Sequence, residues 1–377
     1  MTTRYNRRRF LKKAAAAAGL VAGITGSKAL PSGAEAPPTR EGVSRATDPP
    51  PTLFENAVFL PRISTGRYVP EPRPQADSKL GVHTIRPDGA LGFIQQVHDG
   101  GTFVAAVKAL DDIGYLQLVK SVSPETTRVA RRRIPDYEGI DASGDPVAKA
   151  QAYMSQHMSR WEPDREWVDY WEVLNEADPP STDGHAWLGD FHIACMDIAE
   201  QNGYKLALFS YSAGVPEWWE WEAIVATGVF ARARNGGHIL SLHEYSWPNV
   251  DLYWGEPLPN EDGTWRPAYP DRGSLMGRYR HLYRDFLVPQ NQVIPLVITE
   301  AGYDPNVNRD APGWGGVDWK SQYVSEMAWY DSIMQEDDFV IGCALFTLGP
   351  TPTWEDWDYE ELLDELAAYI ISTIDQT

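Results

Sequence analysis

The sequence predicts an α/β protein, specifically a (β/α)8 TIM barrel formed by a single domain. From residue 80 onward, short runs of β-branched and aromatic residues alternate with longer segments of helical periodicity, which is typical of repeated βα units. Eight such units over residues 80–374 average about 37 residues each, enough for a barrel of roughly 250 residues or more. The alternative is a doubly wound open sheet. That fold usually has a glycine-rich phosphate loop after its first strand, and "IRPDGALG" at 85–92 lacks this fingerprint.

The expected strands are short apolar runs between turn-forming or charged residues. In chain order they are "LGVHTI" (80–85), "YLQLVK" (115–120), "ARRRIP" (130–135), "YWEVLN" (170–175), "LALFSY" (206–211), "ILSLHEY" (239–245), "PLVITE" (295–300) and "GCALFTL" (342–348). Helical periodicity predicts helices over 102–110, 146–160, 185–202, 217–233, 275–287, 319–336 and 359–374. The connection before the third strand, "SPETTRVA", is long enough for barely two helical turns.

The first 36 residues have the three zones of an export signal, in order. A cationic head at 7–13 precedes an apolar run at 14–24, and the small-residue site Ala-Glu-Ala follows at 34–36. The apolar run has eleven residues, whereas a membrane-spanning helix needs about 20. "RRRFLKK" resembles the twin-arginine signal that exports folded proteins. We therefore expect the twin-arginine machinery as a partner during export and a secreted or periplasmic location.

Charge and composition limit the partners of the remaining chain. Residues 37–52 are rich in proline and charge and predict a disordered linker, which leaves 53–377 for the barrel domain. Without residues 1–36 the chain has 26 basic and 52 acidic residues. Such a surface repels phosphate polymers, so nucleic acid and, after signal cleavage, membrane are poor partners. The 15 Trp and 18 Tyr residues either form an aromatic core or provide flat faces for a neutral sugar.

Carboxylates end two of the predicted strands. Glu176 follows "YWEVLN", and Glu300 closes "PLVITE", 124 residues later. Three units of about 41 residues separate them, so they should lie at the ends of strands four and seven. In a barrel, the C-terminal strand ends face one common site. Two acids at one site can cleave a glycosidic bond, one as proton donor and the other as nucleophile or activator of water.

The Asn-Glu pair at 175–176 and "TEAG" at 299–302 resemble the clan A glycoside hydrolases, retaining (β/α)8 enzymes that include cellulases, mannanases and β-glycosidases. The likeness spans strands one to eight. It implies that Glu176 is the general acid/base, that Glu300 is the nucleophile, and that Asn175 holds the sugar 2-hydroxyl. It implies hydrolysis of β-glycosidic bonds in a neutral poly- or oligosaccharide by double displacement.

Strand six, "SLHEYSW", is the third specific feature. Strand alternation puts Ser241, His243 and Tyr245 on one face and Glu244 on the other. Clan members have a His and a Tyr here, which implies that Tyr245 donates a hydrogen bond to the nucleophile. The same resemblance gives His243 a role in substrate binding or in positioning, although a packed core histidine is the alternative. Glu244 then faces away from the site.

The early strands and strand eight depart from the clan pattern. Clan members often have an arginine near the end of an early strand, whereas the predicted second strand ends in Lys120. On strand eight Phe346 occupies the interior position, and Trp354 follows in the loop, where we expect it to contact substrate. His83 on strand one either binds substrate or packs.

Other functional classes are less consistent with the sequence. A non-catalytic carbohydrate-binding barrel is the main alternative, but it predicts that one carboxylate is missing, and both are present. A metal-dependent hydrolase needs clustered ligands, and no His-x-His occurs. No Gly-x-Ser-x-Gly elbow of a serine hydrolase occurs either. The residues imply neither a cofactor nor a metal.

Overall fold

A computed structural model describes residues 74–134, 140–304 and 320–374 of the chain. The predicted signal at 1–36, the predicted linker at 37–52 and the start of the predicted domain lie outside the described residues. Among the helices that are described, none combines the length and the apolar character needed to span a bilayer.

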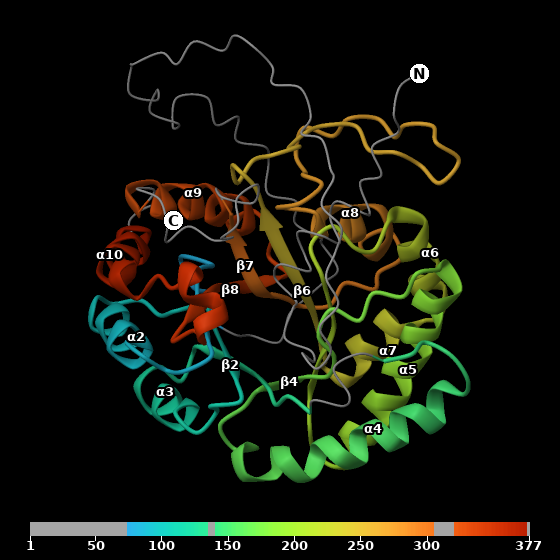
Figure 1. Cartoon of the computed structure of the whole chain (residues 1–377), viewed down its shortest axis with the longest axis horizontal. Coiled ribbons are helices and arrows are strands. Elements are labelled where there is room, and N and C mark those ends of the chain that lie inside the picture. The colour runs from blue at the N-terminus through green and yellow to red at the C-terminus, as the bar shows by residue number, and fades with distance from the viewer. Residues whose placement is uncertain (1–73, 135–139, 305–319, 375–377) are drawn as a thin grey trace, which may run out of the picture.

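Eight parallel strands form a closed barrel in chain order, and the outer helices surround it (Figure 1). This confirms the predicted fold class. The strands are β1 Val82–Thr84, β2 Ala106–Leu110, β3 Thr127–Arg131, β4 Tyr170–Glu172, β5 Leu206–Tyr211, β6 Ile239–Ser246, β7 Leu296–Tyr303 and β8 Val340–Leu348. β1 pairs with both β2 and β8, which closes the barrel and leaves no free edge.

The helices follow the strands as expected of βα units. They are α2 Ala90–Asp99, α3 Leu116–Val122, α4 Pro146–Trp161, α5 Thr182–Gln201, α6 Trp218–Ala226, α7 Val229–Gly236, α8 Tyr279–Leu282, α9 Lys320–Gln335 and α10 Leu363–Ser372, with the π-helical turn η3 Tyr283–Leu287 and the 3-10 turn η4 Pro352–Trp357. Local sequence sets several boundaries. The Asp145 carboxylate accepts from the N–H of Val147 at 3.0 Å and caps α4. The predicted helix over 217–233 divides at Gly228, whose φ of 80° breaks it into α6 and α7.

The second βα unit was predicted wrongly. The predicted strand at 115–120 is mostly α3, and the predicted helix at 102–110 contains β2. All five residues of β2 are buried, so the strand has no polar and apolar alternation to distinguish it from a helix. In α3, Leu116 and Val119 are buried at a helical spacing, but seven residues are too few to reveal that period. The third strand also lies earlier than predicted, at Thr127–Arg131 instead of 130–135, so "SPETTRVA" is not a helix.

The barrel interior changes from apolar to charged along its axis. A closed cluster of buried apolar side chains fills the N-terminal end, namely Ala106, Val129, Tyr170, Ala207, Ile239 and Val297. Two residues further along three of these strands stand Lys108, Arg131 and Glu172, all buried. The packed apolar layer closes the lower end, so the polar groups above it can open only toward the C-terminal ends of the strands.

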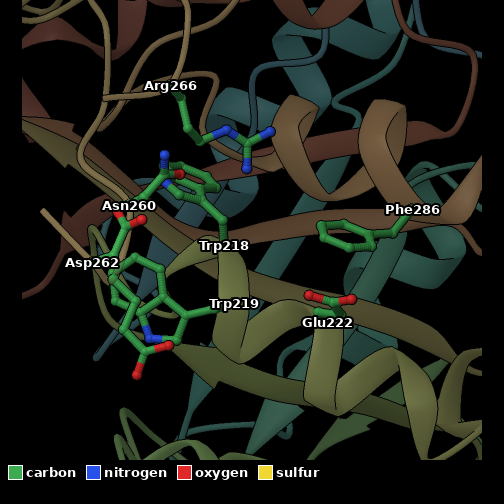
Figure 2. Close-up of a pocket in the computed structure, with 8 residues that line it drawn as sticks. Trp218, Trp219, Glu222, Asn260, Asp262, Arg266 and Phe286 are labelled. Atoms are coloured by element: carbon green, nitrogen blue, oxygen red, sulfur yellow. The ribbon is translucent and has the colours of Figure 1, made fainter. Parts of the chain in front are cut away.

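A hollow of about 510 Å³ lies outside the barrel (Figure 2). Its lining comes from α6, from the long segment 248–272 between β6 and α8, and from η3. None of the eight strands contributes to it. None of the predicted site residues lines it.

Candidate active site

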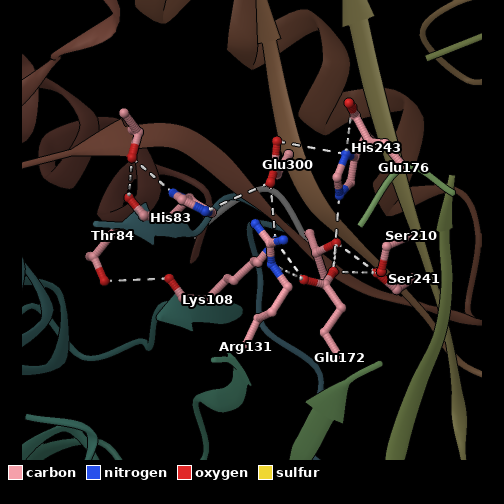
Figure 3. Close-up of polar contacts among 12 residues, drawn as sticks. His83, Thr84, Lys108, Arg131, Glu172, Glu176, Ser210, Ser241, His243 and Glu300 are labelled. Carbon is pink, nitrogen blue, oxygen red and sulfur yellow. Dashed lines mark hydrogen bonds and ion pairs between the residues drawn. The ribbon is translucent and has the colours of Figure 1, made fainter. Parts of the chain in front are cut away.

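Glu176 and Glu300 converge at the C-terminal ends of β4 and β7 (Figure 3). One carboxylate oxygen of each, together with a ring nitrogen of His243, lie within 4.8 Å of one another. The backbone of Glu176 has a φ of 50°, which is uncommon for a residue with a side chain, and its N–H donates to the carbonyl of Ser210 at 2.9 Å. This bond to the end of β5 holds the residue in a strained conformation that turns the chain at the site.

His243 lies between the two carboxylates. Its Nδ1 is 3.0 Å from Oε1 of Glu176 and 3.6 Å from Oε2 of Glu300. Burial alone would lower the pKa of His243, but the surrounding carboxylates, chiefly Glu300, raise it to about 9. The ring is therefore a cation at neutral pH, and a single proton on Nδ1 faces both glutamates.

Three further groups surround Glu300. The ammonium of Lys108 donates to Oε1 at 3.1 Å, and the hydroxyl of Tyr245 donates to Oε2 at 3.1 Å. Nε2 of His83 lies 3.9 Å from Oε1. Burial would raise the pKa of Glu300, but the charges of His243 and Lys108 outweigh that effect and lower the pKa to about 2. Glu300 is thus a buried carboxylate that stays ionised.

A third glutamate supports this arrangement from below. Oε2 of Glu172 lies 2.6 Å from Nζ of Lys108, and Oε1 accepts from the hydroxyls of Ser241 at 2.8 Å and Thr299 at 2.6 Å. Burial disfavours its charged form, yet the cation of Lys108 keeps the pKa of Glu172 well below its usual range. Lys108 therefore bridges two buried carboxylates, that of Glu172 below the site and that of Glu300 at the site (Figure 3).

His83 and Asn175 have polar atoms without a partner near the two glutamates. Nδ1 of His83 is hydrogen-bonded to Oγ1 of Thr347 at 2.8 Å, whereas Nε2 is buried and makes no hydrogen bond with a described residue. Burial, followed by the charge of Lys108, lowers the pKa of His83 to about 3, so its ring is neutral. Oδ1 of Asn175 is likewise buried without a partner among the described residues. Each is a buried polar atom that the described residues leave without a hydrogen bond.

Trp354 is less directly placed. It is buried in an aromatic cluster with Tyr245, Phe346 and Trp357, and its ring meets Phe346 edge-on at a centroid distance of 5.4 Å. Phe346 in turn lies 4.9 Å from the ring of His83. The structure therefore brings together Glu176, Glu300, His243, Tyr245 and His83, while Trp354 reaches them through other aromatic rings.

The sequence interpretation missed Lys108, Arg131 and Glu172. Lys108 was hidden because β2 was taken for a helix, and Lys120, which ended the predicted second strand, lies on α3 and is exposed. Nε of Arg131 lies 3.5 Å from Oε2 of Glu172. A signal for Glu172 was present in the sequence: it alternates with Tyr170 and so faces inward in "YWEVLN". A charge at an inward strand position needs a buried partner.

The triad of Glu176, His243 and Glu300 has the spacing of a metal site. Its electrostatics do not fit one. A histidine ligates a metal through a neutral ring, so a metal here would have to displace a proton that the neighbouring carboxylates favour on His243. Lys108 already donates to Glu300, and its charge opposes a second cation beside that carboxylate.

No protein-family model and no curated protein sequence matches this chain. Among solved structures it is similar to a glycoside hydrolase family 5 enzyme from Prevotella bryantii B14, with 12% identity over 74% of this chain and 86% of that chain and a TM-score of 0.42. It is also similar to the catalytic domain of a mannanase from Streptomyces sp. SirexAA-E, with 16% identity over 89% of this chain and 96% of that chain and a TM-score of 0.41. A β-mannanase from Thermomonospora fusca is similar with 15% identity over 79% of this chain and 87% of that chain and a TM-score of 0.43. Such low values carry no conclusion about activity, and the barrel is established by its own strand pairing.

Proposed function

We propose that this protein is a retaining glycoside hydrolase that cleaves β-glycosidic bonds in a neutral poly- or oligosaccharide. The observation that carries the proposal is the approach of Glu176 and Glu300, two carboxylates with oxygens within 4.8 Å at the open end of a barrel. Retaining enzymes hold their two carboxyl groups about 5–5.5 Å apart, whereas inverting enzymes leave about 6.5–9.5 Å for a water molecule. The short separation favours retention.

In the first step, the ionised carboxylate of Glu300 attacks the anomeric carbon. The bond from that carbon to the glycosidic oxygen breaks, and the proton shared by Nδ1 of His243 and Glu176 passes through the Glu176 carboxyl to the departing oxygen, which leaves His243 neutral. The leaving alcohol is released and a glycosyl ester remains on Glu300. Nδ1 of His243 lies 3.0 Å from Glu176, so the proton that catalysis requires is held on this hydrogen-bonded pair.

In the second step, water replaces the carboxylate. Formation of the ester removes the negative charge of Glu300, and Glu176 then takes a proton from water while the water oxygen bonds to the anomeric carbon. Glu300 leaves as a carboxylate, and Lys108 and Tyr245 are placed to stabilise its returning charge at 3.1 Å each. The unpartnered atoms of Asn175 and His83 supply bonds to substrate hydroxyls.

Product stereochemistry tests the mechanism. With an activated aryl β-glycoside, NMR should show the β-anomer of the sugar as the first product. Glu176→Ala should be slow and should recover with azide, yielding a β-glycosyl azide, because azide needs no general base. An initial α-product would contradict the assignment of Glu300 as nucleophile. Saccharide binding by the wild type, with no hydrolysis of any polysaccharide or aryl glycoside, would instead identify a non-catalytic carbohydrate-binding barrel.

We further propose that the protein acts outside the cytoplasm. This proposal rests on the sequence of residues 1–36, where the twin-arginine-like head, apolar run and small-residue site occur in order. Replacing Arg7 and Arg8 by Lys should retain the full-length precursor inside the cell, as detected by fractionation.

A further inference from the structure

The hollow outside the barrel has the size of a ligand site. Its volume of about 510 Å³ is within the range of about 300–1,000 Å³ typical of small-molecule sites. Figure 2 shows Trp219 together with Asn260 and Asp262 on one side, and Glu222 with Phe286 on the other. Trp219 is half-buried, so part of its indole is accessible to a ligand.

The walls of the hollow are fixed by contacts of their own. The segment 248–272 folds into a tight turn in which Asn260 donates its N–H to the carbonyl of Thr264 at 2.8 Å. The turn is fastened to η3, because Arg266 and Arg272 donate to the two carboxylate oxygens of Asp285 at 2.5 and 2.7 Å. The hollow is thus formed before any ligand arrives, which lowers the entropic cost of binding.

The polar lining is acidic and partly unsatisfied. Glu222 and Glu261 are exposed, and neither makes a hydrogen bond or ion pair with another described residue. Arg266 is the basic member of the lining, and Asp285 already neutralises its charge. An anionic ligand is therefore disfavoured. Free carboxylates accept short, strong hydrogen bonds from hydroxyl groups.

We propose that this hollow is a second saccharide-binding site, which holds a segment of a neutral polysaccharide away from the catalytic glutamates. The indole of Trp219 provides a flat apolar face for a sugar ring, and Glu222 and Glu261 accept bonds from its hydroxyl groups. The choice of a saccharide as ligand rests on the proposed function, whereas the hollow and its chemistry do not.

Affinity electrophoresis in native gels containing a neutral mannan, β-glucan or xyloglucan tests the site. All proteins carry Glu300→Gln, so that the polymer is not consumed and binding in the barrel is the same throughout. At least one polymer should retard this parent, and adding Trp219→Ala should weaken the affinity about tenfold, the typical loss of an aromatic anchor. Trp265→Ala is the matched control, because Trp265 lies in the same segment, is 67% exposed and does not line the hollow.

Glu261→Gln provides a variant that cannot disturb the core, since Glu261 is exposed, and it should weaken binding several-fold. Equal affinity of the parent and the Trp219→Ala variant would overturn the proposal, as would an equal loss in the Trp265→Ala control. Absence of retardation by all three polymers would also overturn it. If the wild type hydrolyses no glycoside while Trp219-dependent retardation persists, the hydrolase proposal fails and the second site stands.

Discussion

Two glutamates on neighbouring strands are both almost fully buried, and their environments differ completely. Glu300 on β7 faces the barrel interior, where Lys108 and His243 lie within 3.6 Å. Glu244 on β6 faces outward and accepts hydrogen bonds from the N–H groups of Gly277 at 2.6 Å and Tyr279 at 2.9 Å, as well as from a tyrosine hydroxyl.

The electrostatic outcome follows from the partners. Burial raises the pKa of Glu244 to about 7, and its hydrogen bonds only partly oppose that effect. The same burial is overcome at Glu300, whose pKa falls to about 2 because two cations face it. Burial by itself favours the neutral form of a carboxyl group, and nearby cations keep Glu300 in the ionised form that its proposed role requires.

The largest expected effect is a difference in kcat/KM between variants of Glu300 and Glu244. Glu300→Gln should lower kcat/KM by at least about 10⁴-fold, because it removes the proposed nucleophile. Glu244→Gln, an identical change at an equally buried position, should change kcat/KM by less than about fivefold, because Glu244 touches none of the reacting atoms. Steady-state kinetics on one aryl glycoside measures both. Similar losses in the two variants would show that Glu300 acts only through the fold.

A smaller effect is expected when Glu300 loses one cation. Lys108→Met should raise the pKa of Glu300, since a carboxylate with a cation nearby is typically lowered by about 1–3 pH units. The acidic limb of the kcat/KM profile should move upward by a similar amount, so the loss of activity is greatest at low pH. Lys108→Arg keeps the charge, so the acidic limb of its kcat/KM profile should lie close to that of the wild type.

The Lys108→Met change also leaves the buried charge of Glu172 without its ion-pair partner, since Glu172 Oε2 lies 2.6 Å from Nζ of Lys108. The double variant Lys108→Met/Glu172→Gln removes both charges and should recover stability, measured by urea unfolding, while the acidic limb stays displaced. Recovery of the wild-type limb in the double variant would mean that Lys108 affects activity only through folding.

The smallest effect is on the pH dependence of the free energy of unfolding, and it depends on Glu244 alone. Its folded pKa of about 7 is raised above its ordinary value of 4.5, so its stabilising contribution is complete below about pH 4.5 and is lost as the pH rises through 7. The wild type should lose about 3 kcal/mol relative to Glu244→Gln between these limits. Urea unfolding of both proteins at each pH gives the difference. Parallel pH dependence would show that folding leaves the pKa of Glu244 unchanged.

The sequence by itself determined the features that depend on neighbouring residues. Alternation in "SLHEYSW" placed His243 and Tyr245 on one face and Glu244 on the other, and the described contacts follow that division. The repeated βα pattern predicted eight units, and so it predicted that Glu176 and Glu300 would meet, although 124 residues separate them. Residue type and spacing are sufficient here, because strand alternation and barrel geometry have fixed periods.

Only the tertiary structure decided the second strand and the charges around Glu300. "FVAAVKAL" is apolar enough for a helix or a fully buried strand, and pairing with β1 and β3 selects the strand. That choice turns Lys108 inward, where it meets Glu172 and Glu300 from two other strands. The two glutamates lie 64 and 192 residues after Lys108 along the chain, and the charge state of each depends on that lysine. No local pattern can specify such a pairing, because it exists only once the barrel has closed.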